Sequence, residues 1–107
     1  MGFFQHIRQV NINEGANLCR SIPGAILLDV RTESEYRSGH IPGSKNIPLQ
    51  QLDKVESVIE NKEGALFVYC YSGARSSQAV SQLRRMGYTN VQNIGGIAAY
   101  HGKVDVV

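Results

Sequence analysis

Two short and uninterrupted apolar runs stand out in this chain, at residues 25–28 and 65–68. Neither run alternates with polar residues, so each predicts a strand that is covered on both faces, as in a parallel sheet between helices. Weaker strand signals lie at residues 8–12, 46–47 and 91–94.

Helical patterns occupy the intervals between these segments, and strands that alternate with helices predict an α/β layer fold. Asn13 can cap the first helix, and Thr32 with Glu35 forms the pattern of a capping box. Gly87 is placed to end the helix that follows the second apolar run. The expected helices span about residues 13–19, 33–39, 49–59, 76–86 and 95–100.

The chain has 107 residues, which suits one domain over residues 1–107. Its apolar fraction of 42% is ordinary for a globular protein, and its net charge of +2 is too small to indicate nucleic-acid binding. Two cysteines are too few for a disulfide scaffold, and no apolar run has the length of a signal peptide or a membrane span. We therefore expect a cytoplasmic monomer that binds neither membranes nor nucleic acid and needs no metal or cofactor.

Residues 70–75 carry the most informative motif, in which one cysteine ends an apolar run and a glycine-containing turn leads into a helix. At such a junction the N–H groups of the turn and of the helix N-terminus can point at the sulfur of Cys70. They stabilise the thiolate and lower its pKa, with Arg75 as a further source of positive charge. No histidine lies beside the loop in sequence, and this arrangement needs none as a base.

The loop is small and tight. Its small side chains are those of Ser72, Gly73, Ala74 and Ser76. They allow backbone N–H groups to approach the sulfur closely. Arg75 closes the loop as C-x4-R and can bond loop carbonyls or hold a sulfonate in its fork. Cysteine-dependent phosphatases and arsenate reductases use C-x5-R, one residue longer, so the shorter ring suits a single sulfur atom bound to Cys70 as a persulfide.

Asp29 and Arg31 follow the other strong strand candidate. Ligands of open parallel sheets bind outside the carboxyl ends of the strands. If the two strong strands are neighbours, Arg31 and Cys70 face one pocket, where Arg31 contacts the substrate or the loop and Asp29 orients Arg31. Cys19 and His40 are interpreted as structural residues.

These segments, in their order along the chain, resemble the signature of rhodanese domains. The matching segments are residues 29–31, 35–36, 39–44, 46–48, 70–76 and 95–100. The resemblance implies a five-stranded parallel sheet with helices on both faces. It also implies a catalytic Cys70 that alternates between thiolate and persulfide, with the persulfide held by the N–H groups of Tyr71 through Ser76.

The leading hypothesis is a sulfurtransferase that moves sulfur from thiosulfate, or a related donor, to cyanide or to a thiol acceptor such as a thioredoxin-like protein. Sulfite is a stable anion, so its release needs no positioned general acid, whereas release of an alkoxide from phosphate benefits from one. Two alternatives stay open. One is a non-enzymatic persulfide carrier that binds partner proteins, and the other is a small phosphatase or arsenate reductase.

Overall fold

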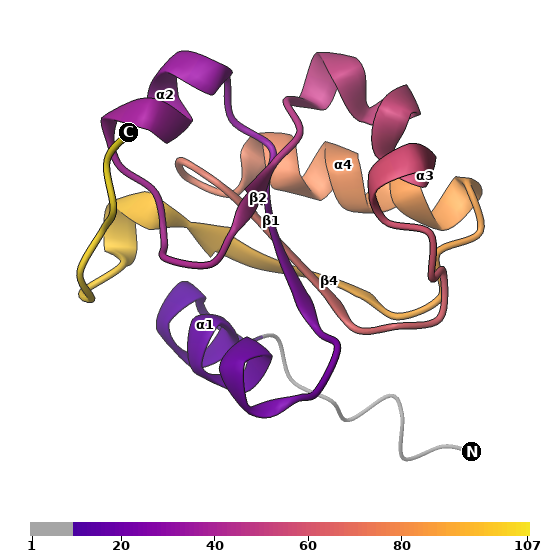
Figure 1. Cartoon of the computed structure of the whole chain (residues 1–107), viewed down its shortest axis with the longest axis horizontal. Coiled ribbons are helices and arrows are strands. Elements are labelled where there is room, and N and C mark those ends of the chain that lie inside the picture. Colours follow the sequence, from indigo (N-terminus) through magenta and orange to yellow (C-terminus); the bar gives the residue numbers. More distant parts are fainter. Residues whose placement is uncertain (1–9) are drawn as a thin grey trace.

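Four parallel strands form the centre of the computed structural model, which describes residues 10–107 (Figure 1). The strands are β1 (Ile26–Asp29), β2 (Lys45–Asn46), β3 (Leu66–Cys70) and β4 (Val91–Gly96), and they lie in the order β2-β1-β3-β4. All three pairings are parallel. The predicted α/β fold with a parallel sheet is confirmed, but the described residues form four strands where five were expected.

The described part of the chain begins with a helix rather than a strand. Asn11 caps α1 (Ile12–Ser21): its side chain accepts hydrogen bonds from the backbone N–H groups of Asn13 and Glu14, and the Glu14 carboxylate accepts one from the N–H of Asn11. The strand predicted at residues 8–12 is therefore wrong from residue 10 onward, and residues 8 and 9 lie outside the described residues. The cap is Asn11 rather than Asn13, because only Asn11 has a Glu three residues later to complete a capping box.

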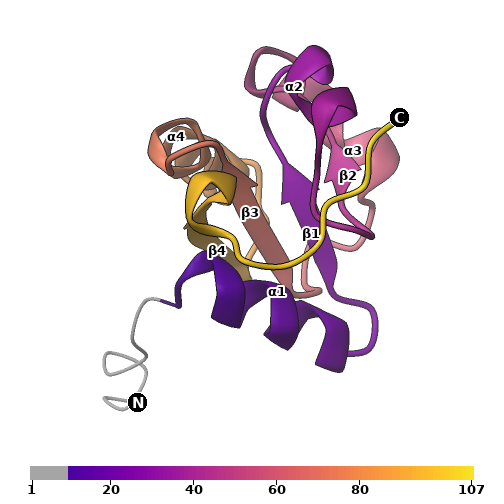
Figure 2. The ribbon, with the colours of Figure 1, turned by 90° about the vertical axis from the view of Figure 1, so that its left-hand side faces the viewer.

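Helices cover both faces of the sheet (Figures 1 and 2). On one face lies α1, where Ile12 and Phe67 belong to one buried cluster. On the opposite face lies α4 (Ala74–Arg85), where Leu83 and Val68 belong to a second cluster. Full burial of each such side chain contributes roughly 1.5–3 kcal/mol, which explains why the central strands are apolar on both sides.

The short helix α2 (Glu33–Ser38) follows β1 and begins with the predicted capping box of Thr32 and Glu35. It ends at Gly39, as expected. The C-terminal residues run beside this helix (Figure 2), and the N–H of Val107 donates to the carbonyl of Arg37 at 3.0 Å.

The helix expected over residues 49–59 is divided into a 3-10 helix, η2 (Leu49–Lys54), and one turn of α-helix, α3 (Val55–Val58). The 3-10 helix is itself kinked at Gln51, whose φ of −114° and ψ of 17° are not helical. The apolar positions of the pattern still serve the core, because Leu52, Val55 and Ile59 are buried. The last predicted helix is a single 3-10 turn, η3 (Ile97–Ala99).

The strand order brings three loops to one edge of the sheet. β1 and β3 are neighbours, with Asp29 opposite Tyr69, so the residues that follow the two strands emerge together. This confirms the adjacency on which the predicted meeting of residues 29–31 with the Cys70 loop depends. On the other side of β3, the end of β4 places Gly96 opposite Cys70. The Cys70 loop therefore lies between segments that follow β1 and β4.

Gly96 is required by a close approach rather than by its backbone angles. Its φ of −133° is open to any residue, but an added Cβ would collide with backbone atoms of Tyr71 and Ser72.

We expect Gly96→Ala to lower the free energy of unfolding, measured by urea titration, by about 1–3 kcal/mol, the usual cost of overpacking. Gly64→Ala is the control, because its Cβ would meet chiefly the flexible side chain of Asn61. Equal midpoints for Gly96→Ala and the wild type would refute this packing.

Candidate active site

Cys70 is the last residue of β3, and the chain turns directly after it into α4, whose first residue is Ala74. Gly73 permits the turn, because its φ of +109° lies in the left-handed region that favours glycine. Two backbone N–H groups point at the Cys70 sulfur: that of Gly73 in the turn donates to Sγ at 3.0 Å, and that of Ser76 in the first turn of α4 donates at 3.3 Å. The sulfur thus lies at the positive end of a helix of 12 residues.

The electrostatic balance at Cys70 favours the thiolate. Burial raises the pKa of the thiol, but hydrogen bonds from the Ser76 side chain and from the N–H groups of Ser76, Gly73 and Ser72 together outweigh burial. The net pKa is lowered, which is the direction predicted from the sequence. A lowered thiol pKa at the start of a helix is typical of nucleophilic cysteines.

The loop covers the sulfur that it holds. Cys70 is only 1% exposed, whereas Tyr71 beside it is 54% exposed. A depression of about 540 Å³ adjoins the loop at Ser72 and Gly73, and it is lined on its other side by the start of α1 and the end of β4. A reagent must therefore reach Sγ through small movements of the loop, which favours compact reagents over bulky ones.

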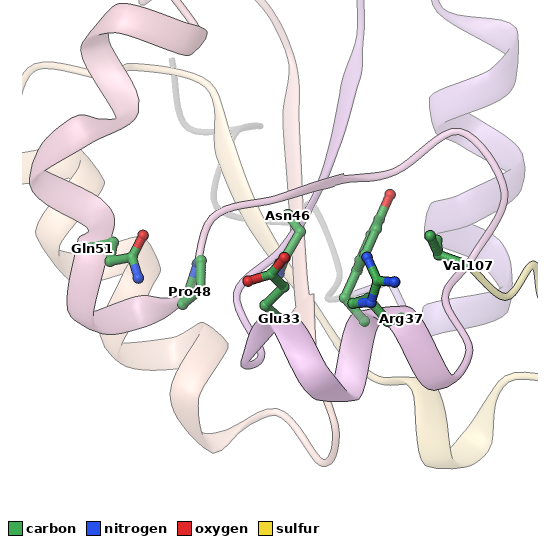
Figure 3. Close-up of a pocket in the computed structure, with 7 residues that line it drawn as sticks. Glu33, Arg37, Asn46, Pro48, Gln51 and Val107 are labelled. Carbon is green, nitrogen blue, oxygen red and sulfur yellow. The ribbon is translucent and has the colours of Figure 1, made fainter.

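A separate pocket of about 410 Å³ lies between α2, the end of β2 and η2 (Figure 3). Glu33 and Arg37 of α2 line it together with Asn46 and Gln51, and the C-terminal Val107 lies at its side. None of its lining residues belongs to the loop of residues 70–76. The pocket is thus distinct from the Cys70 site.

Arg75 is held by a carboxylate. Its guanidinium donates two hydrogen bonds to Glu35 of α2, at 2.7 Å and 3.0 Å. The sequence predicted a capping role for Glu35, which is confirmed, but missed this second partner, which is 40 positions away along the chain. The hydrogen bond from Arg75 is the main cause that lowers the pKa of Glu35 to about 2, so this carboxylate is ionised throughout the neutral range.

Arg31 and Asp29 form a buried ion pair at the end of β1. The Nε and Nη2 groups of Arg31 donate to the Asp29 carboxylate, with the shortest contact at 2.7 Å, and Nη2 also donates to the carbonyl of Gly39. Asp29 thus orients Arg31, as expected. These hydrogen bonds direct the guanidinium group of Arg31 toward Asp29 and toward the carbonyl of Gly39 at the end of α2. Contact of Arg31 with the substrate or the loop therefore stays a prediction.

A residue that the sequence did not single out, Asn93 of β4, contacts the loop from the side of β4. Its Nδ2 donates to the carbonyl of Gly73 at 3.2 Å, and its Oδ1 accepts from the N–H of Gly95 at 2.9 Å and from the hydroxyl of Ser76 at 2.8 Å. The Ser76 hydroxyl also lies 3.3 Å from the Cys70 sulfur. Nothing in the local sequence marks Asn93 as a contact of the loop, because Gly73 and Ser76 are distant along the chain and are brought to it by the pairing of β3 with β4.

Cys19 and His40 have the structural surroundings expected of them. Cys19 is a free cysteine of α1, and burial raises the pKa of its thiol. The His40 ring stacks on Tyr36 with centroids 3.8 Å apart, and its Nδ1 lies 2.8 Å from the carbonyl of Tyr36. Its backbone pairs with Asp105, which ties the C-terminal segment to the body of the protein.

Across residues 10–107, no three side chains of His, Cys, Asp or Glu gather in a group that could hold a metal ion. In the same part of the chain, none of the helices combines the length and the apolar character needed to cross a membrane.

Comparison with known proteins matches most of the chain to one domain family. A family model for the rhodanese-like domain matches residues 13–103. Thiosulfate sulfurtransferase PspE of Escherichia coli (strain K12) is 38% identical over 71 residues, which cover 65% of this chain and 68% of that protein. Putative sulfur carrier protein YrkF of Bacillus subtilis (strain 168) is 34% identical over 80 residues, which cover 74% of this chain and 43% of that protein. A solved structure described as a rhodanese with anions from E. coli superimposes with a TM-score of 0.73 at 32% identity, over 78% of this chain and 100% of that one.

The Glu35–Arg75 ion pair makes stability depend on pH. The folded-state pKa of Glu35 is depressed to about 2, so the pair's stabilisation is fully present above the ordinary carboxyl pKa and is lost as pH falls toward about 2. Both side chains are about one-third exposed, so we expect a contribution below about 1 kcal/mol. Unfolding free energies from urea titrations should differ between wild type and Glu35→Gln at neutral pH and converge in acid.

Gln at position 35 preserves the capping box, so the comparison isolates the charge. Glu33→Gln in the same helical turn is the matched control and should show no such convergence. A wild-type advantage that persists unchanged into strong acid would argue against the ion pair.

Proposed function

This chain belongs to the rhodanese-like family, and we propose that it is a sulfurtransferase that carries sulfur as a persulfide on Cys70. The observation that carries the proposal is the pair of N–H groups, from Gly73 and Ser76, that point at Sγ. The name of PspE, a thiosulfate sulfurtransferase, supports thiosulfate as the donor.

The proposed reaction has two half-reactions on one sulfur atom. The Cys70 thiolate attacks the outer sulfur of thiosulfate, and the bond between the two sulfur atoms of the donor breaks, with its electron pair leaving on sulfite. A thiolate acceptor or cyanide then attacks the outer sulfur of the Cys70 persulfide, and Cys70 departs as a thiolate. Two half-reactions through a covalent intermediate predict ping-pong kinetics.

The backbone of the loop, Arg75 and Arg31 have different roles in this proposal. The backbone N–H groups of residues 71–76 stabilise the terminal sulfur of the persulfide, which is anionic like the Cys70 thiolate. Arg75 is the candidate to receive the sulfonate of thiosulfate, but it must first exchange the Glu35 carboxylate for the donor. Arg31 acts through Asp29 to keep the neighbouring edge of the sheet in place.

The second candidate function is a sulfur carrier that other proteins load and unload. It is favoured by the name of YrkF, a putative sulfur carrier, and by the low exposure of Cys70, which suits a site that a partner opens. Family membership favours both of these over the phosphatase or arsenate reductase considered from the sequence.

We expect incubation with thiosulfate to add one sulfur atom to the intact protein, as read by mass spectrometry, and cyanide to remove it as thiocyanate. Cys70→Ser should abolish both steps because it removes the nucleophile. Cys19→Ser should retain both, since Cys19 is the other free cysteine.

The yield of thiocyanate separates the two candidates. Many turnovers for each protein molecule indicate an enzyme, and a single loading indicates a carrier. Failure of the wild type to gain sulfur from thiosulfate and from a persulfide donor alike would overturn both.

A further inference from the structure

The orientation of the Asn93 side-chain amide is set by its two backbone partners. A backbone N–H only donates and a backbone carbonyl only accepts, so the N–H of Gly95 must meet Oδ1 and the carbonyl of Gly73 must meet Nδ2. A flipped amide would oppose two donors on one side and two acceptors on the other. The oxygen of Asn93 therefore faces Ser76.

This orientation decides what the Ser76 hydroxyl can do. Its oxygen lies 2.8 Å from Asn93 Oδ1 and 3.3 Å from the Cys70 sulfur, with the carbonyl of Gly95 farther away at 3.5 Å. A hydroxyl has one proton, and Asn93 Oδ1 can only accept. While Ser76 donates to Asn93, it presents a lone pair to the sulfur, which suits a thiol but not a thiolate. To stabilise the thiolate, the hydroxyl must turn and give up Asn93.

We propose that Asn93 is a positioning residue for Cys70, which holds Gly73 of the loop in place and competes with the sulfur for the proton of Ser76. The proposal deepens the proposed function, because the same sulfur is the nucleophile there. In the thiol form, Cys70 donates to Ser76 and Ser76 donates to Asn93. In the thiolate form, Ser76 donates to Cys70, and Asn93 keeps its bond from Gly95.

The charged groups near this edge of the sheet do not take part in the exchange. Arg75 is paired with Glu35 of α2, and Arg31 is paired with Asp29 of β1. Substitutions at positions 76 and 93 do not change the residues of either ion pair. The influence of the two pairs on the pKa of Cys70 is therefore the same in every variant compared.

A double-mutant cycle tests the competition without assuming the effect of either substitution alone. The thiolate of Cys70 is titrated by ultraviolet absorbance in the wild type, Ser76→Ala, Asn93→Ala and the double variant, each with its Cys70→Ser counterpart subtracted to remove Cys19. In the Asn93→Ala background the Ser76 proton is free for the sulfur. We expect Ser76→Ala to raise the Cys70 pKa more in that background than in the wild type. Equal or smaller rises would overturn the proposal.

Asn93→Asp keeps the shape of the side chain and covers the case in which Asn93→Ala does not fold. It retains an oxygen for Ser76 but adds negative charge and removes the donor to Gly73. We expect about tenfold slower alkylation of Cys70 by iodoacetamide at neutral pH, since a raised thiol pKa leaves less thiolate. Asn90→Asp, in the exposed turn before β4, places the same charge at the other end of the strand and should leave the rate unchanged. Equal rates for Asn93→Asp and the wild type would contradict the proposal.

These titrations contain no sulfur donor, so they do not depend on persulfide chemistry. If the wild-type protein gains no sulfur, the proposed function is overturned. The double-mutant cycle still measures the coupling between Ser76 and Asn93 in the pKa of Cys70. Normal sulfur loading together with additive pKa changes would overturn the role of Asn93 alone.

Discussion

Hydrogen bonds from the backbone N–H groups of Gly73 and Ser76 to the Cys70 sulfur are the interactions on which this site depends. They form because β3 ends at the cysteine and α4 begins four residues later, after one residue in the left-handed region. Close packing of Gly96 beneath the loop removes the room for any side chain there. The chemistry of the sulfur is thus a consequence of how a strand, a turn and a helix meet.

Hydrogen bonds from the Ser76 hydroxyl and from backbone N–H groups of the loop, rather than a cationic side chain, account for the lowered pKa of Cys70. Burial of the thiol opposes ionisation, and the hydrogen bonds of the loop outweigh it. Arg75 is the nearby cation expected from the sequence, but Glu35 neutralises it at 2.7 Å.

The sequence predicted the parts of the fold that local patterns determine. The apolar runs identified β1 and β3, and the spacing of Thr32 and Glu35 identified the start of α2. The expected strand at residues 8–12 was wrong over its described residues because a capping box at Asn11 outweighs a weak apolar alternation. Contacts between distant positions, such as Glu35 with Arg75 and Asn93 with the loop, could not be predicted, because they depend on strand order and register rather than on spacing along the chain.

Titration of the Cys70 thiolate in the wild type and in Arg75→Ala measures most directly whether the hydrogen bonds of the loop, rather than Arg75, activate this cysteine. Ultraviolet absorbance, with the Cys70→Ser counterparts subtracted, gives the pKa of each. We predict a pKa below the ordinary cysteine value in the wild type and a similarly low value in Arg75→Ala, because Glu35 already pairs with the arginine. An ordinary or raised pKa in the wild type, or a return to the ordinary value in Arg75→Ala, would show that the loop amides do not hold the thiolate.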